Sequence, residues 1–339
     1  MNAFVSINRG FGGAEKQFDQ LYLDFCKRPA VMGSWSYVRC DRASLGWWAT
    51  LCKLLRIRDE VVVYNMSVLG IGVLPMLLLK ALGNRIVLYP HVVVPAARSR
   101  PRLWRIRTWL QRLSLRLADH VVLISDGNWF ELEPFLSAAK ATIVYNYVGC
   151  ENDRLFQSPP LNRKIAVIGR IQDGHKQQLS FLREHGALIK DAGLELHFFG
   201  SGPDEPALRE EVRIQDLDAY CVLHGWLDEE AIYAHDFSFV LNLSRWEGLP
   251  LSVIEALYRD RIALASDING NRELVYSDFL FKNDGELRQL LLTMVRDHRV
   301  DVELLRAQKQ RLFKRCNKEQ ALATLELMLG QLCQHGRTR

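Results

Sequence analysis

The stretch Ser244–Glu255, SRWEGLPLSVIE, is where the interpretation of this chain begins. Its Gly-Leu-Pro turn precedes apolar residues at helical spacing, and proline suits the first position of a helix because its missing N–H would have no partner there. Glu247 therefore precedes a helix, and Glu255 lies about one and a half turns inside it. The start of a helix favours a phosphate, and carboxylates suit sugar hydroxyls. The stretch predicts a site for a ligand that carries both groups.

Length and composition indicate a soluble protein with two domains. The 339 residues are too many for one ordinary domain, and the hydrophobic (48%) and charged (24%) fractions are those of globular proteins. Seven cysteines without a C-x-x-C pair argue against a zinc site or a disulfide framework, and indicate a reducing compartment. The residues after Met1 lack the pattern of a signal peptide, so we expect none, and the apolar run Val68–Leu79 is too short to span a bilayer.

Apolar strands alternate with helical segments in both halves of the chain. The expected strands are AFVSIN, 61–65, 85–94, 120–125 and 142–148 in the first half, and 164–170, 195–203, 222–226, 237–244 and 261–267 in the second. This alternation is typical of parallel sheets covered on both faces. We expect α/β architecture with two facing Rossmann-like αβα domains, 1–157 and 158–317, and a cleft between them. A C-terminal helix at about 318–335 would pack back on the first domain.

Several motifs then follow one another in a familiar order. They are GGAE (12–15), LADHVVLIS (117–125), YNYVG (145–149), VIGR with Lys176 six residues after Arg170, FFGSGP (198–203), LHGW (223–226), the E-x7-E pair Glu247 and Glu255, and ASDINGNREL (265–274). With these motifs nearly the whole chain resembles the retaining glycosyltransferases of family 4, which have the GT-B fold. It departs from the family where Gln177, in place of a common glycine, follows Lys176, and where the first domain ends in Asn146-Tyr147-Val148-Gly149.

The resemblance implies roles for individual residues. Arg170 and Lys176 would neutralise the departing diphosphate without a metal or cofactor, Glu247 would contact the transferred sugar, and Glu255 the ribose. His91, at the end of a strand, would lie near the reacting sugar. The other implied donor contacts are Gly12, Gly13, Ser201, Gly202, Gly225, Gly248, Leu249 and Leu251, with weaker indications for Asn271 and Glu273.

Each of these assignments has a purely structural alternative. Arg170 and Lys176 could be a solvated pair, the glycines plain turns, and Glu255 an ordinary helix glutamate. His91 could be packed against the following loop. Trp226, beside the expected nucleotide pocket, is interpreted as a core residue.

Positive charge is concentrated in the first half. Residues 1–160 contain 20 Lys and Arg against 12 Asp and Glu, whereas the remainder contains 24 against 27. Leu103, Ile106, Leu110, Leu113 and Leu117 mark one face of an expected helix, and Arg102, Arg105, Trp109, Arg112 and Arg116 mark a second. Arginines around a tryptophan suit an anionic membrane surface. Nucleic acid is the competing polyanion, which we do not expect, and a solvated basic face is the structural alternative.

The resemblance implies a retaining, metal-independent glycosyltransferase. It would move a hexosyl or N-acetylhexosaminyl group from a UDP- or GDP-sugar to a lipid-linked or cell-envelope saccharide, as in polysaccharide, O-antigen or capsule biosynthesis. The acceptor hydroxyl would attack on the leaving-group face, so no protein nucleophile is needed. The expected location is cytoplasmic, peripheral at the inner face of the cell membrane.

Two other functions stay open. One is a nucleotide-sugar epimerase on the same fold, and the other is a catalytically silent, membrane-associated scaffold. A nicotinamide dehydrogenase is disfavoured, because the first loop, Gly10-Phe11-Gly12-Gly13, is not G-x-G-x-x-G.

Overall fold

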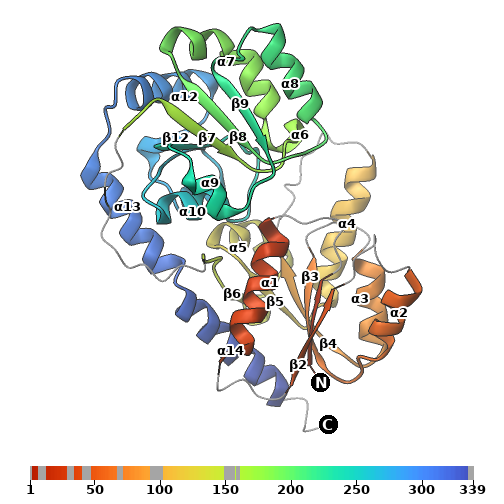
Figure 1. The fold of residues 1–339 in the computed structure, drawn as a ribbon. Coiled ribbons are helices and arrows are strands. Elements are labelled where there is room, and N and C mark those ends of the chain that lie inside the picture. Colours follow the sequence, from red (N-terminus) through yellow and green to blue (C-terminus); the bar gives the residue numbers. More distant parts are fainter. Residues whose placement is uncertain are drawn as a thin grey trace. The chain divides into compact units, whose positions relative to one another are not determined.

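The chain consists of two compact units in a computed structural model that describes residues 2–6, 13–28, 34–39, 47–66, 72–91, 102–148, 157 and 161–334 (Figure 1). The side chains of 47–50, 102–105 and 107–108 are not among those described. Unit 1 comprises Met1–Gly149 together with Asn317–Arg339, and unit 2 comprises Cys150–Cys316. Each unit has one parallel sheet, as the sequence predicts, but each sheet has six strands where five were expected, because the strands at Trp35–Arg39 and Leu280–Phe281 were not predicted. Among the described helices, none is both long and apolar enough to cross a bilayer.

The sheet of unit 1 has the strand order β2-β1-β3-β4-β5-β6. Its strands are β1 (Asn2–Ser6), β2 (Trp35–Arg39), β3 (Val61–Met66), β4 (Arg85–Pro90), β5 (His120–Leu123) and β6 (Ala141–Ile143). The helices are α1 (Gly13–Cys26), α2 (Trp47–Leu55), α3 (Val73–Ala81), α4 (Arg102–Leu117), α5 (Asp126–Leu132) and α14 (Lys318–Gln334), with short 3-10 turns at Glu133–Phe135 and Ala138–Lys140. The order changes direction between β1 and β3, which makes the carboxyl ends of these strands the expected ligand edge.

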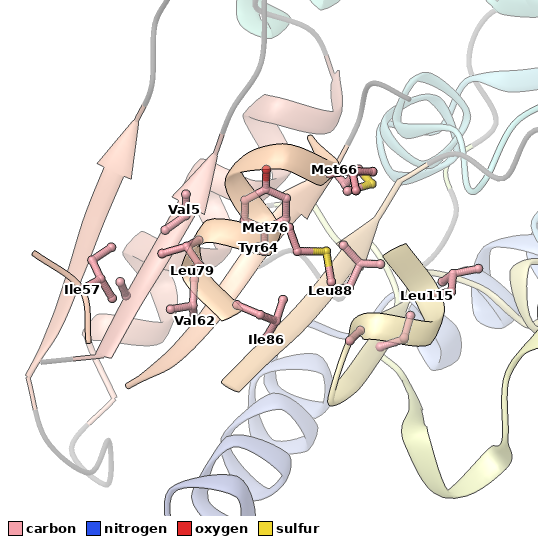
Figure 2. Close-up of a cluster of buried hydrophobic side chains, with 14 of the residues drawn as sticks. Val5, Ile57, Val62, Tyr64, Met66, Met76, Leu79, Ile86, Leu88 and Leu115 are labelled. Carbon is pink, nitrogen blue, oxygen red and sulfur yellow. The ribbon is translucent and has the colours of Figure 1, made fainter. Parts of the chain in front are cut away.

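Side chains cover both faces of this sheet. On one face Val62 and Tyr64 of β3 pack with Met76 and Leu79 of α3 and with Leu115 of α4 (Figure 2). On the other face Phe4 of β1 lies 5.5 Å from Phe18 and 5.6 Å from Phe25 of α1, measured between ring centroids. All six residues of β3 are consequently buried, as expected for the central strand of a covered parallel sheet.

Helix α14 belongs to unit 1 although it ends the described chain. Its residues Ala321, Leu322, Leu325, Met328 and Leu329 are buried, and the helix contacts α1 and β3. Arg28 after α1 forms ion pairs with Glu326 (2.7 Å) and Glu319 (2.8 Å) of α14. Arg85 of β4 donates to the carbonyl of Leu332 at 2.7 Å. Helix α14 is therefore held on unit 1 by apolar packing and by charged contacts.

The sheet of unit 2 has the order β12-β11-β10-β7-β8-β9. Its strands are β7 (Lys164–Ile168), β8 (Glu195–Phe199), β9 (Cys221–Gly225), β10 (Phe239–Asn242), β11 (Ile262–Ser266) and β12 (Leu280–Phe281). The α-helices are α6 (Asp173–Lys176), α7 (Gln178–Ala192), α8 (Glu205–Ile214), α9 (Glu229–Ala234), α10 (Leu251–Tyr258), α11 (Asn269–Arg272), α12 (Asp284–Leu290) and α13 (Val302–Arg315). A 3-10 turn spans Ser277–Phe279, and a π-helical segment spans Leu291–Arg296. Strand β7 lies between β8 and β10, so the strand order reverses there and the loops after β7 and β10 are neighbours.

Candidate active site

The helix predicted after the Gly-Leu-Pro turn is α10. Pro250 is its N-cap, with extended backbone angles, so the first helical residue is Leu251, one position later than predicted. Val253, Ile254 and Ala256 are buried, and Glu255 is buried with them at 8% exposure. The interpretation of Glu255 as an ordinary solvated glutamate is therefore wrong.

Lys176 and Glu247 form an ion pair in which both side chains are largely buried. Lys176 ends α6 after β7, and Glu247 lies in the loop after β10, so the adjacency of the two strands brings them together. Their side chains are 17% and 11% exposed. One carboxylate oxygen of Glu247 accepts from the Lys176 ammonium and, at 2.7 Å, from the Ser244 hydroxyl. The structural alternative of a solvated surface lysine is therefore wrong for Lys176.

The local charges favour the ionised form of Glu247. Burial by itself would raise the pKa of Glu247, but the Lys176 ammonium acts against it. The hydrogen bonds from Lys176 and Ser244 act in the same direction as the ammonium charge, so the pKa of this carboxyl is lowered. The site thus holds a fixed negative charge beside a fixed positive one.

His175 and Trp246 form a second layer that the sequence did not suggest. Their rings stack at 4.7 Å with an interplanar angle of 6°, and the Nε2 atom of His175 lies 2.7 Å from the Trp246 carbonyl oxygen. The backbone N–H of Arg245 donates to the His175 carbonyl at 2.9 Å. Burial, and then the Lys176 charge, lower the pKa of His175, so this imidazole is neutral at pH 7. In the sequence, His175 directly precedes Lys176 and Trp246 directly precedes Glu247, and this is the one sign of the stacking that the sequence contains.

Two glycines allow the loops after β7 and β8 to touch through their backbones. A Cβ atom at Gly202 would lie 2.6 Å from the carbonyl carbon of Ile171 and closer still to its oxygen. Gly200 has φ +134° and would press a Cβ against the Gly169 carbonyl. The exposed Ser201 accepts a backbone hydrogen bond from Ile171 at 3.2 Å. This close contact explains the glycines in FFGSGP structurally, whatever ligand role they also have.

The other donor residues expected in unit 2 lie at the same ends of the strands. Arg170 follows β7 and is exposed, while Gly225 ends β9 with φ +73° and open space at its Cβ position. Gly248 and Leu249 are buried before α10, and Leu251 is half-buried. A Cβ atom at Gly270 would lie 2.7 Å from the Gly248 carbonyl oxygen.

Of the weaker candidates, Asn271 is fully buried and donates to the Ser266 carbonyl at 2.8 Å. Glu273 pairs with Arg315 at 3.2 Å, outside the pair formed by Lys176 and Glu247. Trp226 is 64% exposed, so its interpretation as a core residue is wrong: it directly follows β9, the edge strand of the sheet.

A separate polar cluster lies at the carboxyl ends of the strands of unit 1. Asn65 of β3 donates to the Ser6 hydroxyl of β1 at 3.2 Å, and both are buried. His91, directly after β4, is 3% exposed, and its ring centroid lies 4.8 Å from that of Tyr89. Burial lowers the pKa of His91 to about 3, so its imidazole is neutral. Within the described part of the chain, His91 Nε2 and Asn65 Oδ1 are buried without a hydrogen-bond partner.

Of the predicted glycine loop, Gly13 is the first residue of α1, and Gly12 lies outside the described residues. The backbone of Gly13 is therefore at the start of the helix, where N–H groups have no partners within the helix.

Helix α4 packs on the core with part of the apolar face that the sequence marks. Leu110, Leu113 and Leu117 are half-buried against the core cluster, whereas Ile106 is 55% exposed. Among the described side chains of the helix, Gln111, Ser114 and Leu115 are buried. The Ser114 hydroxyl donates to the Leu110 carbonyl at 2.8 Å, which satisfies its hydrogen bond and allows this small face to approach the sheet.

The basic positions of α4 are divided between two environments. Trp109 is 60% exposed, and Arg116 is also exposed. Arg112 is half-buried, with its guanidinium carbon 4.2 Å from the centroid of the Phe135 ring. The side chains of Arg102 and Arg105 lie outside the described residues.

Comparison with known proteins is consistent with this geometry. Residues 162–297 match the family model described as glycosyl transferases group 1. Over 94 residues, 27% of this chain, the sequence is 28% identical to the poly(ribitol-phosphate) alpha-N-acetylglucosaminyltransferase of Staphylococcus aureus, and the match spans 19% of that protein.

Two solved structures illustrate the similarity of the fold. Anabaena HepE in complex with UDP and glucose has a TM-score of 0.74 at 13% identity, covering 97% of this chain and 99% of that one. A TarM mutant of S. aureus, in complex with fondaparinux, alpha-GlcNAc-glycerol and UDP, has a TM-score of 0.64 at 16% identity, covering 83% of this chain and 57% of that one. The chain thus spans little more than half of TarM. Residues 162–297 are a group 1 glycosyltransferase domain in a chain that has the GT-B fold.

Proposed function

We propose that this protein is a retaining glycosyltransferase of family 4. It would transfer a hexosyl or N-acetylhexosaminyl group from a UDP- or GDP-sugar to a lipid-linked or cell-envelope saccharide, without a metal cofactor. The observation that carries the proposal is the buried pair of Lys176 and Glu247 at the point where the strand order of a group 1 domain reverses. Ligands of open α/β sheets bind at such a point.

The pair offers the two chemical functions that a nucleotide-sugar requires. Lys176 has three N–H donors, so it can stay bonded to Glu247 and still donate to a phosphate oxygen. The ionised Glu247 carboxylate accepts hydrogen bonds from sugar hydroxyls. Together with the exposed Arg170, Lys176 would stabilise the charge that develops on the departing diphosphate. Fixed charges of this kind accelerate transfer without a protein nucleophile.

The acceptor side of the proposal rests on unit 1. The neutral His91 and Asn65 have buried polar atoms without partners among the described residues, as groups that bind a substrate hydroxyl would. We place the acceptor sugar at this edge of the sheet. The exposed Trp109, Ile106 and Arg116 on α4 would hold the protein peripherally on the anionic inner face of the cell membrane, where a lipid-linked acceptor is found.

A turnover assay tests the proposal. The purified protein is incubated with a panel of UDP- and GDP-sugars and a lipid-linked saccharide acceptor, and the glycosylated product is measured. Lys176→Ala and Glu247→Ala should each lower turnover by at least about 10²-fold, because each removes charge from the transition state. The matched control is Lys190→Ala, which removes an ion-paired lysine at the other end of α7 and should leave turnover unchanged.

The possible outcomes separate the competing functions. Near-normal turnover in both site variants would refute the roles of Lys176 and Glu247. An isomerised donor without glycosylated product would identify an epimerase. A scaffold would show no thermal stabilisation by any nucleotide-sugar, because only a ligand that binds the folded state raises the melting temperature.

The proposed membrane binding is tested separately, by measuring how much protein binds to vesicles that contain anionic lipid. Trp109→Ser and Arg116→Ser should weaken binding, whereas Arg209→Ser on α8, which removes another exposed arginine, should not. Equal binding by all variants would contradict the assignment to α4.

A further inference from the structure

Three of the nine histidines of the chain meet on one face of the sheet of unit 2. His197 lies on β8, His224 near the end of β9, and His235 at the C-cap of α9. Their ligand nitrogens all lie within 4.8 Å of one another. The ring centroids of His224 and His235 are 4.5 Å apart, and those of His197 and His224 are 5.2 Å apart. Nothing in the proposed transfer reaction uses this cluster.

The hydrogen bonds fix the tautomer of His197. Its Nε2 atom lies 2.8 Å from a carboxylate oxygen of Glu195, two residues earlier on the same face of β8. A carboxylate only accepts, so Nε2 carries a proton and Nδ1 is the nitrogen of His197 that can turn to a metal ion. Nδ1 lies 2.9 Å from His224 Nε2. A carboxylate that accepts from the outer nitrogen of a histidine is the arrangement found behind metal-bound histidines.

The position of His224 is set by an irregularity of the edge strand. Phe198 pairs with Leu223 and Phe199 with Gly225, so His224 is the extra residue of a β-bulge. Its ring stacks on Phe199 with a centroid distance of 4.5 Å. Bulges are common at sheet edges beside functional sites, where they redirect one side chain.

We propose that His197, His224 and His235 bind a late first-row divalent metal ion, with Zn²⁺ the preferred candidate. Three imidazole nitrogens are a ligand set that zinc accepts, with a fourth position left for water. Bonds of about 2.0 Å would hold the nitrogens about 3.3 Å apart, so the widest pair has to close by only about 1.5 Å. Glu195 orients His197 from behind and offsets part of the added charge.

The bound metal ion would stabilise the local structure of unit 2 and would take no part in the transfer chemistry. His224 and His235 bracket the segment Gly225–Ala234, which includes the predicted donor residue Gly225 and the exposed Trp226. An ion bound to both histidines would tie this segment, with α9, to β8.

The test is a calorimetric titration of tag-free protein with Zn²⁺ at pH 7.5. Wild-type protein should bind one equivalent, and His224→Ala and His235→Ala should weaken binding by at least about 10²-fold. Glu195→Gln keeps all three ligands but loses the carboxylate, and should weaken binding by about 10- to 100-fold. His298→Asn, an exposed histidine outside the cluster, is the matched control and should bind like wild type.

Failure of wild-type protein to bind Zn²⁺, or wild-type affinity in His235→Ala, would overturn the proposal. Circular dichroism without metal checks that each variant is folded. If an alanine variant does not fold, Co²⁺ added to wild-type protein decides the question. A strong visible spectrum of tetrahedral Co²⁺ would support the site, and the weak spectrum of hexaaqua Co²⁺ would refute it.

Discussion

Replacing Lys176 by methionine should destabilise unit 2 before any substrate is added. The variant keeps most of the side-chain volume but leaves the Glu247 carboxylate, 11% exposed, with the Ser244 hydroxyl at 2.7 Å and no ammonium group. Removing one member of a fully buried pair costs about 3–5 kcal/mol. The remaining exposure and the Ser244 hydrogen bond reduce this, so we expect about 2–3 kcal/mol in the free energy of unfolding.

The difference in unfolding free energy between wild type and Lys176→Met should depend on pH. In the wild type the pKa of Glu247 is lowered, so its contribution to stability is present at neutral pH and is lost as the pH falls below the ordinary carboxyl range. In Lys176→Met, burial is no longer opposed by the ammonium, and the pKa of Glu247 should be raised. At acidic pH, protonation neutralises the Glu247 carboxyl group and reduces the loss of stability in the variant. The difference in stability between wild type and variant should therefore narrow from pH 7 to pH 4.

The assay is equilibrium urea unfolding of wild type, Lys176→Met, Glu247→Gln and the double variant. The double-mutant cycle should give a coupling energy of about 2 kcal/mol. Lys164→Met is the matched control, because Lys164 and Asp236 form a pair whose side chains are 34% and 72% exposed. It should change stability by no more than about 0.5 kcal/mol. A coupling energy below about 0.5 kcal/mol, or a difference that widens in acid, would refute the reasoning.

Two further predictions concern single residues. Gly202→Ala should destabilise unit 2 by about 1–3 kcal/mol, because the added Cβ collides with the backbone of Ile171. The control Gly174→Ala has nothing within 4 Å of its added Cβ and should change the free energy of unfolding by less than about 0.5 kcal/mol. Urea unfolding measures both variants, and equal effects would contradict the collision. The pKa of buried His91 is lowered from 6.5 to about 3, so the wild type should lose up to about 1.4 kcal/mol of stability per pH unit as the pH falls between those values. His91→Asn should remove this loss. Parallel profiles of stability against pH for wild type and variant would show that His91 does not cause it.

Local patterns were sufficient for the architecture. The apolar run of β3 predicted a strand covered on both faces, and all six of its residues are buried. Pro250 predicted the start of α10 to within one residue. These features depend on a few neighbouring residues and on the period of the side chains, which the sequence displays directly.

Contacts between distant segments could not be predicted in the same way. The stacking of His175 on Trp246 depends on β7 lying next to β10, and the histidine cluster depends on a bulge in β9. On α4 the buried residue Ser114 is not apolar, so the apolar pattern of the sequence does not mark it. These contacts are determined by tertiary packing, which a local sequence pattern reflects only indirectly.

The docking of α14 on unit 1 has a consequence for biosynthesis. Unit 2 is one uninterrupted stretch of chain, but unit 1 needs residues from both ends of the sequence. On the ribosome, the part of unit 1 that is synthesised first therefore stays incomplete until α14 has emerged, and the apolar surface that α14 covers stays exposed throughout that interval. Nascent chains of this protein should accordingly depend on chaperones until α14 has been synthesised, although unit 2, which precedes it, can already be folded.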